Sequence, residues 1–431
     1  IDYHDAAYFL RYSNTLQMSR IVDSDAANST ATTGQTSAYA VGTYTKPQIA
    51  NDANFLNQQT ALDSDGHTFV ARFPGTLGNS IRVSICPPSI NDSAFDGWTY
   101  KGSFDAAPGT STFASNNDAT NDEVHVAIVD VNGEFSGTKG TVLETYPYVS
   151  VATNAVNADD GGNIYVKDII NTNSEYVHFI DFDSNFTNFG NAGTAITPGT
   201  TKDFLGTAVQ TSATVNFEFD SGVDTGTLTT GRYLAGFDLF EDKDVVEVDF
   251  LIAPGMTSRA DQTTVVNDLI AIASSRKDCV VVSGPARDDI VNKYSASTVT
   301  TNLVATAESF TRSSYNIVAG NYLKVYDKYN DKFIDIPANS SIAGLMAETD
   351  RIAAPWFSPA GTRRGQLLGV TSLAFNPNKT RRDTLYKSGI NPIVNLPGQG
   401  ILLFGDKTGL ARPSAFDRIN VRRLFLTLER A

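Results

Sequence analysis

The sequence has 431 residues, with 33 Lys and Arg against 47 Asp and Glu, which gives a formal charge of −14. A hydrophobic content of 41% with only 19% charged residues indicates a folded chain, because disordered chains combine low hydrophobicity with high charge. The absence of a long apolar run in the sequence argues against a membrane partner, and a pI near 4.7 argues against direct binding of nucleic acid.

The charge is distributed unevenly along the chain. Residues 1–350 carry 20 basic and 43 acidic side chains, a net of −23, whereas residues 351–431 carry 13 basic and four acidic side chains, a net of +9. A molecule that is acidic at one end and basic at the other can attract copies of itself head to tail. A basic segment also fits a phosphate ligand or an acidic domain of the same chain, so both alternatives stay open.

The cysteines indicate the compartment in which the protein assembles, and the chain ends indicate whether the sequence is a fragment. Cys86 and Cys279 lie outside any C-x-x-C spacing, so no disulfide is predicted and assembly in a reducing cytoplasm is favoured. The sequence begins at Ile1 without a signal segment and reaches Ala431 inside a helical pattern. We therefore expect both ends to be cut.

The first 231 residues predict a short helix, a polar linker and a β-rich region. Residues 1–22 predict a helix and then a strand at 18–22, and the small polar residues of 24–67 predict a linker or small insertion. Alternating apolar residues at 124–129 and 215–219 predict strands, and Asn132-Gly133 predicts a type I′ hairpin turn after the first of these. The polar stretches at 91–122 and 186–213 predict exposed loops.

After residue 231 the pattern changes to alternating helices and strands. We predict a helix around 232–240, an apolar strand at 245–253, a helix at 259–275 and a strand at 279–283. Apolar strands joined by helices are typical of a parallel sheet that helices cover. The predicted fold is therefore α/β plus β, with a discontinuous α/β core domain (1–23 and 232–431) and an inserted, loop-rich β domain (68–231).

The sequence contains few of the motifs that are typical of enzymes. The four histidines share no metal-binding spacing, and no G-x-S-x-G elbow is present. Gly405-Asp406-Lys407-Thr408 departs from a P-loop because Asp406 would repel the phosphate that backbone amides should hold. We therefore predict no enzyme, no catalytic residue, no metal and no cofactor.

Three carboxylate clusters contain the oxygen atoms that calcium prefers as ligands. The clusters at 63–66, 181–183 and 241–244 supply hard oxygen atoms, but none continues to the closing Glu of a calcium loop. Asp is also common in turns because its side chain caps local backbone groups, so turn chemistry is favoured. A glycosidase pair of carboxylates stays open, since that pairing is spatial.

The basic end, residues 351–431, is the most informative part of the sequence. Asn376-Pro377 and Gly389 bound a predicted helix, and a final helix is predicted to start at Ser414. Apolar residues at 421, 424, 425 and 428 recur at helical spacing. This stripe predicts a core-facing side, opposite an exposed guanidinium side that is formed by Arg418, Arg422, Arg423 and Arg430.

Four motifs in this region carry a resemblance to a known family. In chain order they are Ser358-Pro359-Ala360-Gly361, Ile390-Asn391-Pro392, the segment Leu403-Phe404-Gly405-Asp406-Lys407-Thr408 and the segment Phe416-Asp417-Arg418-Ile419-Asn420-Val421-Arg422-Arg423-Leu424-Phe425. The ordered set resembles the tail sheath protein of contractile-tailed bacteriophages. The likeness extends more weakly over residues 232–350, and residues 24–230 are hardly matched.

The resemblance implies a structural subunit of a virion tail rather than an enzyme. Such subunits stack as rings into a helical sheath around a tail tube, and their contraction drives the tube through the host envelope. The family implies self-association and contacts with the tube, baseplate and tail terminator proteins. It also implies an α/β core that faces the tube and inserted domains that project outward, with assembly in the host cytoplasm.

A helical polymer needs heterologous interfaces, in which one patch meets a different patch on the next copy. The arginines of the basic end suit such an interface because a guanidinium binds carboxylates through two hydrogen bonds. The predicted interface residues are Arg363, Arg364, Arg381, Arg382, Arg418, Arg422, Arg423 and Arg430. A solvated basic face is the alternative interpretation.

A different function class also stays open. The loop-rich β region, with Trp98, Tyr100, Tyr146 and Tyr148, suits a surface protein that binds or degrades carbohydrate. Those aromatic residues are also ordinary core residues of a β domain.

Overall fold

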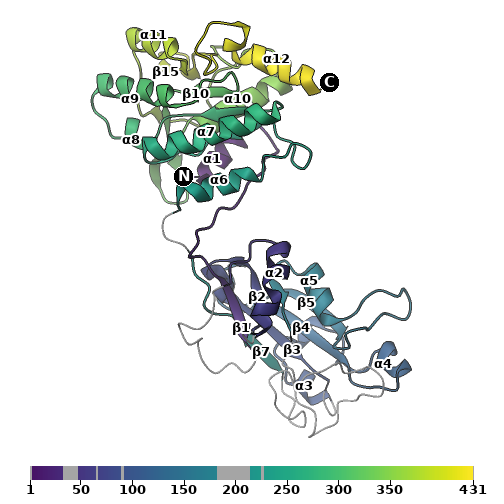
Figure 1. The fold of residues 1–431 in the computed structure, drawn as a ribbon. Helices are drawn as coiled ribbons and strands as arrows, with labels where there is room; N and C mark the ends of the chain where they lie inside the picture. Colours follow the sequence, from purple (N-terminus) through teal and green to yellow (C-terminus); the bar gives the residue numbers. More distant parts are fainter. Residues whose placement is uncertain are drawn as a thin grey trace. The chain divides into compact units, whose positions relative to one another are not determined.

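The computed structural model describes residues 2–32, 47–64, 67–88, 92–181, 214–224 and 228–430. The predicted loop at 186–213 lies outside these residues. The chain divides into two compact units, which are described separately (Figure 1): unit 1 comprises Ile1–Ile21 with Leu228–Ala431, and unit 2 comprises Val22–Thr227. The fold is thus a mixture of helices and several sheets.

The described residues of unit 1 form 18 helices, strands and turns. In chain order they are α1 (Asp2–Phe9), α6 (Thr230–Asp238), β8 (Phe250–Ile252), α7 (Arg259–Arg276), β9 (Val280–Ser283), α8 (Arg287–Ile290), α9 (Ala296–Ser309), β10 (Asn316–Ala319), β11 (Tyr322–Asp327), β12 (Lys332–Pro337), α10 (Asn339–Ile352), β13 (Ser372–Leu373), α11 (Lys379–Lys387), β14 (Ile390–Asn391), β15 (Ile393–Leu396), β16 (Gly400–Leu403), the 3₁₀ turn η5 (Ala415–Asp417) and α12 (Ile419–Arg430).

The centre of unit 1 is a four-stranded parallel sheet in the order β14-β10-β9-β8. The parallel pairing that the strand–helix–strand sequence predicted is confirmed. Val281 packs against α7, while its neighbours Val280 and Val282 pack on the opposite face with Ile342 of α10. Successive residues of a strand point to opposite faces, so both faces of this sheet are buried.

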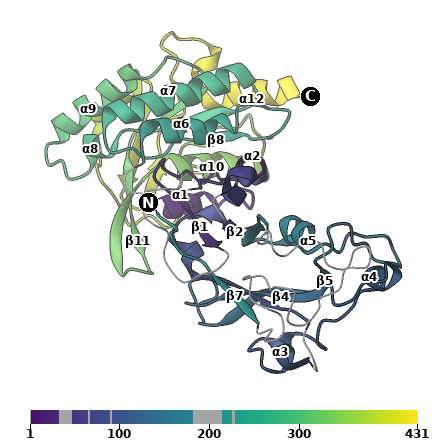
Figure 2. The ribbon, with the colours of Figure 1, turned by 60° about the horizontal axis from the view of Figure 1, so that its bottom comes forward.

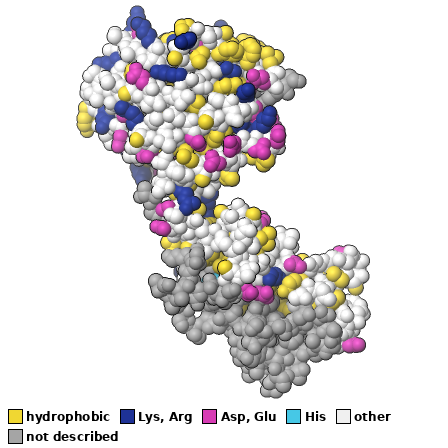
Figure 3. Space-filling model, viewed as in Figure 1, with side chains coloured by type: hydrophobic (Ala, Val, Ile, Leu, Met, Phe, Trp, Pro, Cys, Tyr) yellow, Lys and Arg dark blue, Asp and Glu magenta, His cyan; other side chains and the backbone are white. Residues whose placement is uncertain are grey.

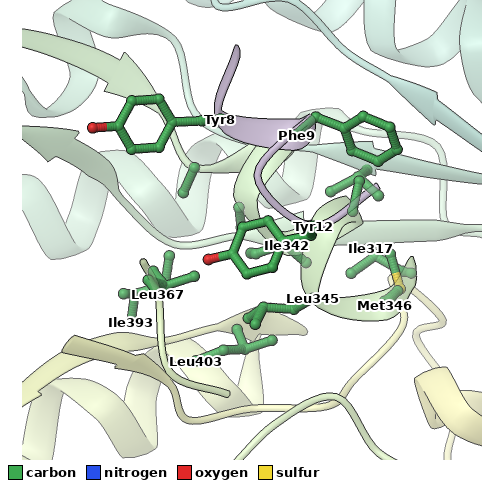
Figure 4. Packing of buried hydrophobic residues seen from close by; sticks show 14 of the residues in the cluster. Tyr8, Phe9, Tyr12, Ile317, Ile342, Leu345, Met346, Leu367, Ile393 and Leu403 are labelled. Atoms are coloured by element: carbon green, nitrogen blue, oxygen red, sulfur yellow. The ribbon is translucent and has the colours of Figure 1, made fainter. Parts of the chain in front are cut away.

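The beginning of the chain completes one of these two cores. Tyr8, Phe9 and Tyr12, at and just beyond α1, pack with Ile342, Leu345 and Met346 of α10 (Figure 4). The Tyr12 ring lies so close to Gly344 that a Cβ atom there would approach a ring carbon to 2.4 Å. Tyr8 Oη also donates a hydrogen bond of 2.8 Å to the Gly369 carbonyl.

A second sheet of unit 1 forms a projecting hairpin. β11 and β12 pair in antiparallel fashion, with β13 on the other side of β11, and β11 extends beyond the body of the unit (Figure 2). β15 and β16 form a separate two-stranded ribbon. No helix in the described ranges is long and apolar enough to cross a bilayer.

Unit 2 is built mainly from strands. Its described elements are β1 (Asn28–Thr32), α2 (Asp52–Ser64), β2 (His67–Pro74), η1 (Thr76–Ser80), β3 (Ile81–Cys86), α3 (Ser93–Asp96), η3 (Lys101–Ser103), α4 (Thr112–Asn116), β4 (Glu123–Asp130), β5 (Thr141–Ser150), α5 (Val166–Asn173), β6 (Val177–Phe179) and β7 (Val215–Glu218). The sheets β1-β2-β6 and β5-β4-β3-β7 share one core.

Several local predictions are wrong. Residues 18–22 form no strand. The stretch 24–67, expected to be a polar linker or small insertion, contains β1 and α2, so it is not a plain linker. Asn132-Gly133 does not form a two-residue hairpin, because ten residues separate β4 from β5. The Asp130 carboxylate instead accepts hydrogen bonds from the Ser80 hydroxyl, at 2.5 Å, and from the backbone amides of residues 133–136, at 2.8–3.0 Å. These hydrogen bonds lower its pKa to about 2, although burial acts to raise it.

β4 was predicted to be half-buried and is buried on both faces. Val126 points into the shared core, while Ala127 and Val129 pack under Trp98. The stretch 91–122 was expected to be an exposed loop, but its buried Trp98 covers that second face and donates from Nε1 to Ser84 Oγ at 2.8 Å. Trp98 and Tyr146 are therefore core residues.

The buried histidines of unit 2 predict a pH-dependent stability. Burial lowers the pKa of both His67 and His178 to about 4, whereas an unfolded histidine has a pKa of about 6.5. Because the unfolded chain binds more protons, stability is full above about pH 6.5 and falls as the pH drops towards 4. We expect a loss of about 1–2 kcal/mol for each histidine between pH 7 and 5.

The measurement is urea unfolding of the chain as a function of pH. His178 stacks on Phe55 with ring centroids 4.2 Å apart, so His178→Phe keeps the stacking and removes the proton site. The variant should show a smaller loss of stability between pH 7 and 5 than the wild type. An unchanged pH dependence would show that His178 does not titrate in this way.

Candidate subunit-contact surface

The motifs of the basic end are brought together on unit 1 by a set of local contacts. Helix α11 begins where Asn378 Oδ1 accepts a hydrogen bond of 3.0 Å from the Arg381 amide. It ends before Gly389, whose φ of 83° lies in the left-handed region that glycine tolerates. The predicted helix bounded by Pro377 and Gly389 is confirmed.

Asp406 links three of the four motifs. Its carboxylate accepts a hydrogen bond of 2.5 Å from Arg418 and longer ones, of 3.3 Å, from Tyr386 and Ser358. Arg418 also donates to Tyr386 Oη at 2.8 Å, and its hydrogen bond with Asp406 raises its pKa. The carboxylate that breaks the P-loop pattern is therefore a structural acceptor that fixes the surface loops.

Large apolar side chains are exposed around this network. Trp356, Phe357 and Phe404 are each nearly half exposed, at 48%, 44% and 47%. The Arg364 guanidinium lies 5.2 Å from the Phe357 ring, and Arg382 lies 5.4 Å from the Phe404 ring. Asn420 at the start of α12 donates to the Trp356 carbonyl at 3.3 Å.

The final helix has the opposite orientation to the one that its sequence predicted. Ser414 caps the short turn η5 rather than α12, which starts at Ile419 after an extended Arg418. The buried residues of α12 are Ile419, Arg422, Arg423 and Leu426. The predicted guanidinium face is thus wrong for Arg422 and Arg423, because both side chains are buried inside unit 1.

Each of the two buried guanidinium groups has aromatic, hydroxyl or carboxylate partners within unit 1. Arg422 lies between the rings of Tyr315 and Phe416, at 4.3 and 4.4 Å, and donates to Ser314 Oγ at 2.5 Å. Arg423 pairs with Asp350, whose carboxylate pKa is raised by burial although the guanidinium acts to lower it. The aromatic and ionic partners compensate the loss of hydration that burial of a charge costs.

The predicted core stripe of α12 faces outward instead. Leu428 is 59% exposed and Phe425 38% exposed, while Val421 and Leu424 are half-buried. Phe425 contacts Phe416 at 4.9 Å between centroids. Apolar side chains gather over α12 on the face of unit 1 shown in Figure 3. We define the C-terminal surface as Trp356, Phe357, Arg364, Arg382, Phe404, Arg418, Phe425 and Leu428.

The other predicted arginines fall into three groups. Arg363 and Arg418 are exposed, and Arg364, Arg381 and Arg382 are half-buried. Arg364 is fixed by a hydrogen bond of 2.8 Å from its Nε to the Ser358 carbonyl. Arg430 is the last residue of α12, and its side chain lies outside the described residues.

The exposed aromatic residues of the surface were missed by sequence reasoning. Trp356 and Phe357 directly precede the Ser358 motif, and Phe404 lies inside the Asp406 motif. Their position among arginines is a signal that could have found them, because Trp and Arg are enriched at the energetic centres of protein interfaces. Within the described ranges, no group of three His, Cys, Asp or Glu side chains is placed to hold a metal ion.

Comparisons with known proteins identify the family. Residues 226–409 match the model of the phage tail sheath protein central domain. The tail sheath protein of Vibrio phage KVP40 is 38% identical over 51% of this chain and 35% of its own length. The tail sheath protein of Salmonella phage ViI is 30% identical over 99% of this chain and 73% of its own length. The chain belongs to the tail sheath protein family.

The tail sheath relatives are longer than the matched chain. The chain spans about a third of the length of the KVP40 relative and about three quarters of the ViI relative. Among solved structures, the sheath tail protein from Desulfitobacterium hafniense shares 13% identity over 99% of this chain and 68% of that chain, with a TM-score of 0.44.

The buried arginine pair of this sheath chain predicts a stability effect. Arg423→Ala leaves the Asp350 carboxylate without its partner, and we expect the free energy of unfolding to fall by about 3 kcal/mol. Combining Arg423→Met with Asp350→Leu removes both charges and should recover most of the loss. Urea unfolding of the three chains measures the difference.

A chain with Arg423→Ala that unfolds at the wild-type urea concentration would contradict the burial of this ion pair. Because Arg422 and Arg423 are both buried, charge-reversal variants at these positions cannot serve as a direct test of subunit contacts. Reversing their charge would place unpaired carboxylates in the core of unit 1 and unfold it. Such variants therefore report on folding before they report on subunit contacts.

Proposed function

We propose that this chain is a structural subunit of a contractile phage tail sheath. It polymerises helically around the tail tube, and contraction of the polymer drives the tube through the host envelope. The observation that carries the proposal is the relationship to a tail sheath protein across 99% of the chain. The chain acts in the virion tail after assembly in the host cytoplasm, and it is not an enzyme.

The proposal assigns a role to each unit. Unit 1, the α/β core made from both ends of the chain, faces the tube, and unit 2 projects outward as an insertion. The partners are further copies of the chain, the tube protein, and the baseplate and tail terminator proteins at the two ends of the sheath. The C-terminal surface supports contacts of unit 1 with further copies of the chain, because it exposes large aromatic rings beside arginines.

Contraction requires subunit contacts that can be exchanged. Arg363 is exposed on unit 1, and ion pairs at exposed positions contribute roughly 0–1 kcal/mol each. Such contacts can be replaced by others of similar energy when subunits slide past one another. Of the four aromatic residues that suited a carbohydrate-binding role, Trp98 and Tyr146 are only 3% and 8% exposed, Tyr100 is half-buried and Tyr148 is 36% exposed, so most of these rings are not available to a sugar.

The test is polymer formation by the purified chain, observed by electron microscopy. Trp356→Ala and Phe404→Ala remove exposed rings of the C-terminal surface, and each should raise the concentration needed for polymerisation roughly tenfold. Tyr294→Ala is the matched control, since Tyr294 is a fully exposed aromatic residue of unit 1 outside that surface. Wild-type polymer yields from both surface variants would contradict the assigned interface.

A further inference from the structure

Unit 1 contains a large cavity that its own side chains leave open. Its volume is about 1150 Å³, and it lies between the segment that follows α1, the α6 region, β8 and α10. The apolar lining comes from Leu16 and Met18 on one side and from Tyr233, Phe237 and Phe240 on the other. Met18 lines the cavity and is 76% exposed. An apolar hollow of this size fits a group of side chains from a partner.

The cavity is bordered by a strongly acidic segment. The stretch 238–249, which connects α6 to β8, contains six acidic residues and one Lys, and its Glu247 and Asp249 line the cavity. Acidic side chains gather on this flank of unit 1 in Figure 3. Asp2, Asp5 and Asp350 add to the lining, against the basic Arg11 and Arg351.

The acidic segment is held in place by one buried arginine. Arg276 is 5% exposed and donates to the carbonyls of Phe240 and Val246, at 2.5 and 2.9 Å. Its other hydrogen bonds, of 2.9 and 2.8 Å, go to the Asp278 carboxylate. Both ends of the segment are thereby tied to the end of α7, so the border of the cavity is formed before any partner arrives.

The same unit carries a surface with the opposite properties. The apolar stripe of α12 consists of residues at i, i+3, i+4 and i+7, which is the arrangement of a helix that lies in a groove. It belongs to the segment 351–431, whose net charge of +9 includes the buried Arg422 and Arg423 and also Arg351, which lines the cavity itself. The stripe lies opposite the side that buries Arg422 and Arg423 in its own unit, so it points away from the body of unit 1.

We propose that the exposed stripe of α12 of one copy inserts into the acid-bordered cavity of the next copy. The apolar stripe matches the apolar lining, and the exposed cations of the C-terminal segment, such as Arg412 and Arg418, have the charge opposite to that of the acidic 238–249 segment. Because the two patches are different surfaces of one chain, the contact is heterologous and can repeat along a polymer. The inference rests on the proposed function and names the surface that receives the C-terminal helix.

Cysteine cross-linking between two separately labelled chains tests the contact directly. Leu428→Cys supplies the helix side and Met18→Cys the cavity side, and the native Cys86 and Cys279 are buried. On oxidation, a mixture of the two variants should give a cross-linked dimer that contains one chain of each kind. Neither variant alone should give it, because each then lacks its complementary cysteine.

Three other results would overturn the contact. A dimer formed by Leu428→Cys alone would place two α12 helices against each other. A chain that carries both cysteines and closes a disulfide within itself at high dilution would show that the cavity is filled by its own helix. No cross-link at concentrations that support polymers would show that the two patches do not meet.

Polymer formation separates this inference from the proposed function. Leu428→Glu should abolish polymers through burial of an unpaired charge, Leu428→Met should keep them, and Met18→Lys should partly restore Leu428→Glu. Thermal melting at the wild-type temperature confirms that each variant is folded. Normal polymers from Leu428→Glu overturn the α12 contact and leave the sheath function standing, whereas a wild-type chain that never polymerises overturns the function itself.

Discussion

Burial of two guanidinium groups sets the orientation of the C-terminal helix, and the exposed surface of unit 1 follows from it. Arg422 is held between two aromatic rings and Arg423 by Asp350, so the side of α12 that carries them must face the core. The apolar residues on the opposite side are then forced outward. A helix with two such faces is stable in unit 1 and leaves Phe425 and Leu428 exposed.

The rest of unit 1 provides a rigid support for that surface. The parallel sheet is buried on both faces, and its two cores meet α7 and α9 on one side and α1 and α10 on the other. Arg423 reaches this scaffold directly, since its guanidinium lies 5.4 Å from the ring of Phe250 in β8. The helix that forms part of the C-terminal surface is therefore attached to the edge of the central sheet.

Sequence reasoning succeeded where local signals decide the structure. Ser258 caps α7, and the helix that it begins ends at Arg276, one residue beyond the predicted end. The reasoning failed for α12 because a stripe of apolar residues shows only that two faces differ. Which face is buried depends on partners far away in the chain, such as Tyr315 and Asp350, and no local pattern reveals them. The hairpin prediction at Asn132-Gly133 failed for a local reason. The Asp130 carboxylate binds the backbone amides of the residues that follow it and so organises a longer connection than an Asn-Gly turn.

The contacts between α1 and the late part of the chain have a consequence for biosynthesis. Asp5 meets Ser340, and Tyr8 meets the Gly369 carbonyl, across separations of 335 and 361 residues. Since domains fold as units during synthesis, the intervening segment that forms unit 2 can complete its core while the first helix still waits for its partners. Unit 2 can therefore fold before unit 1, because α1 needs contacts with residues that are synthesised more than 300 residues later.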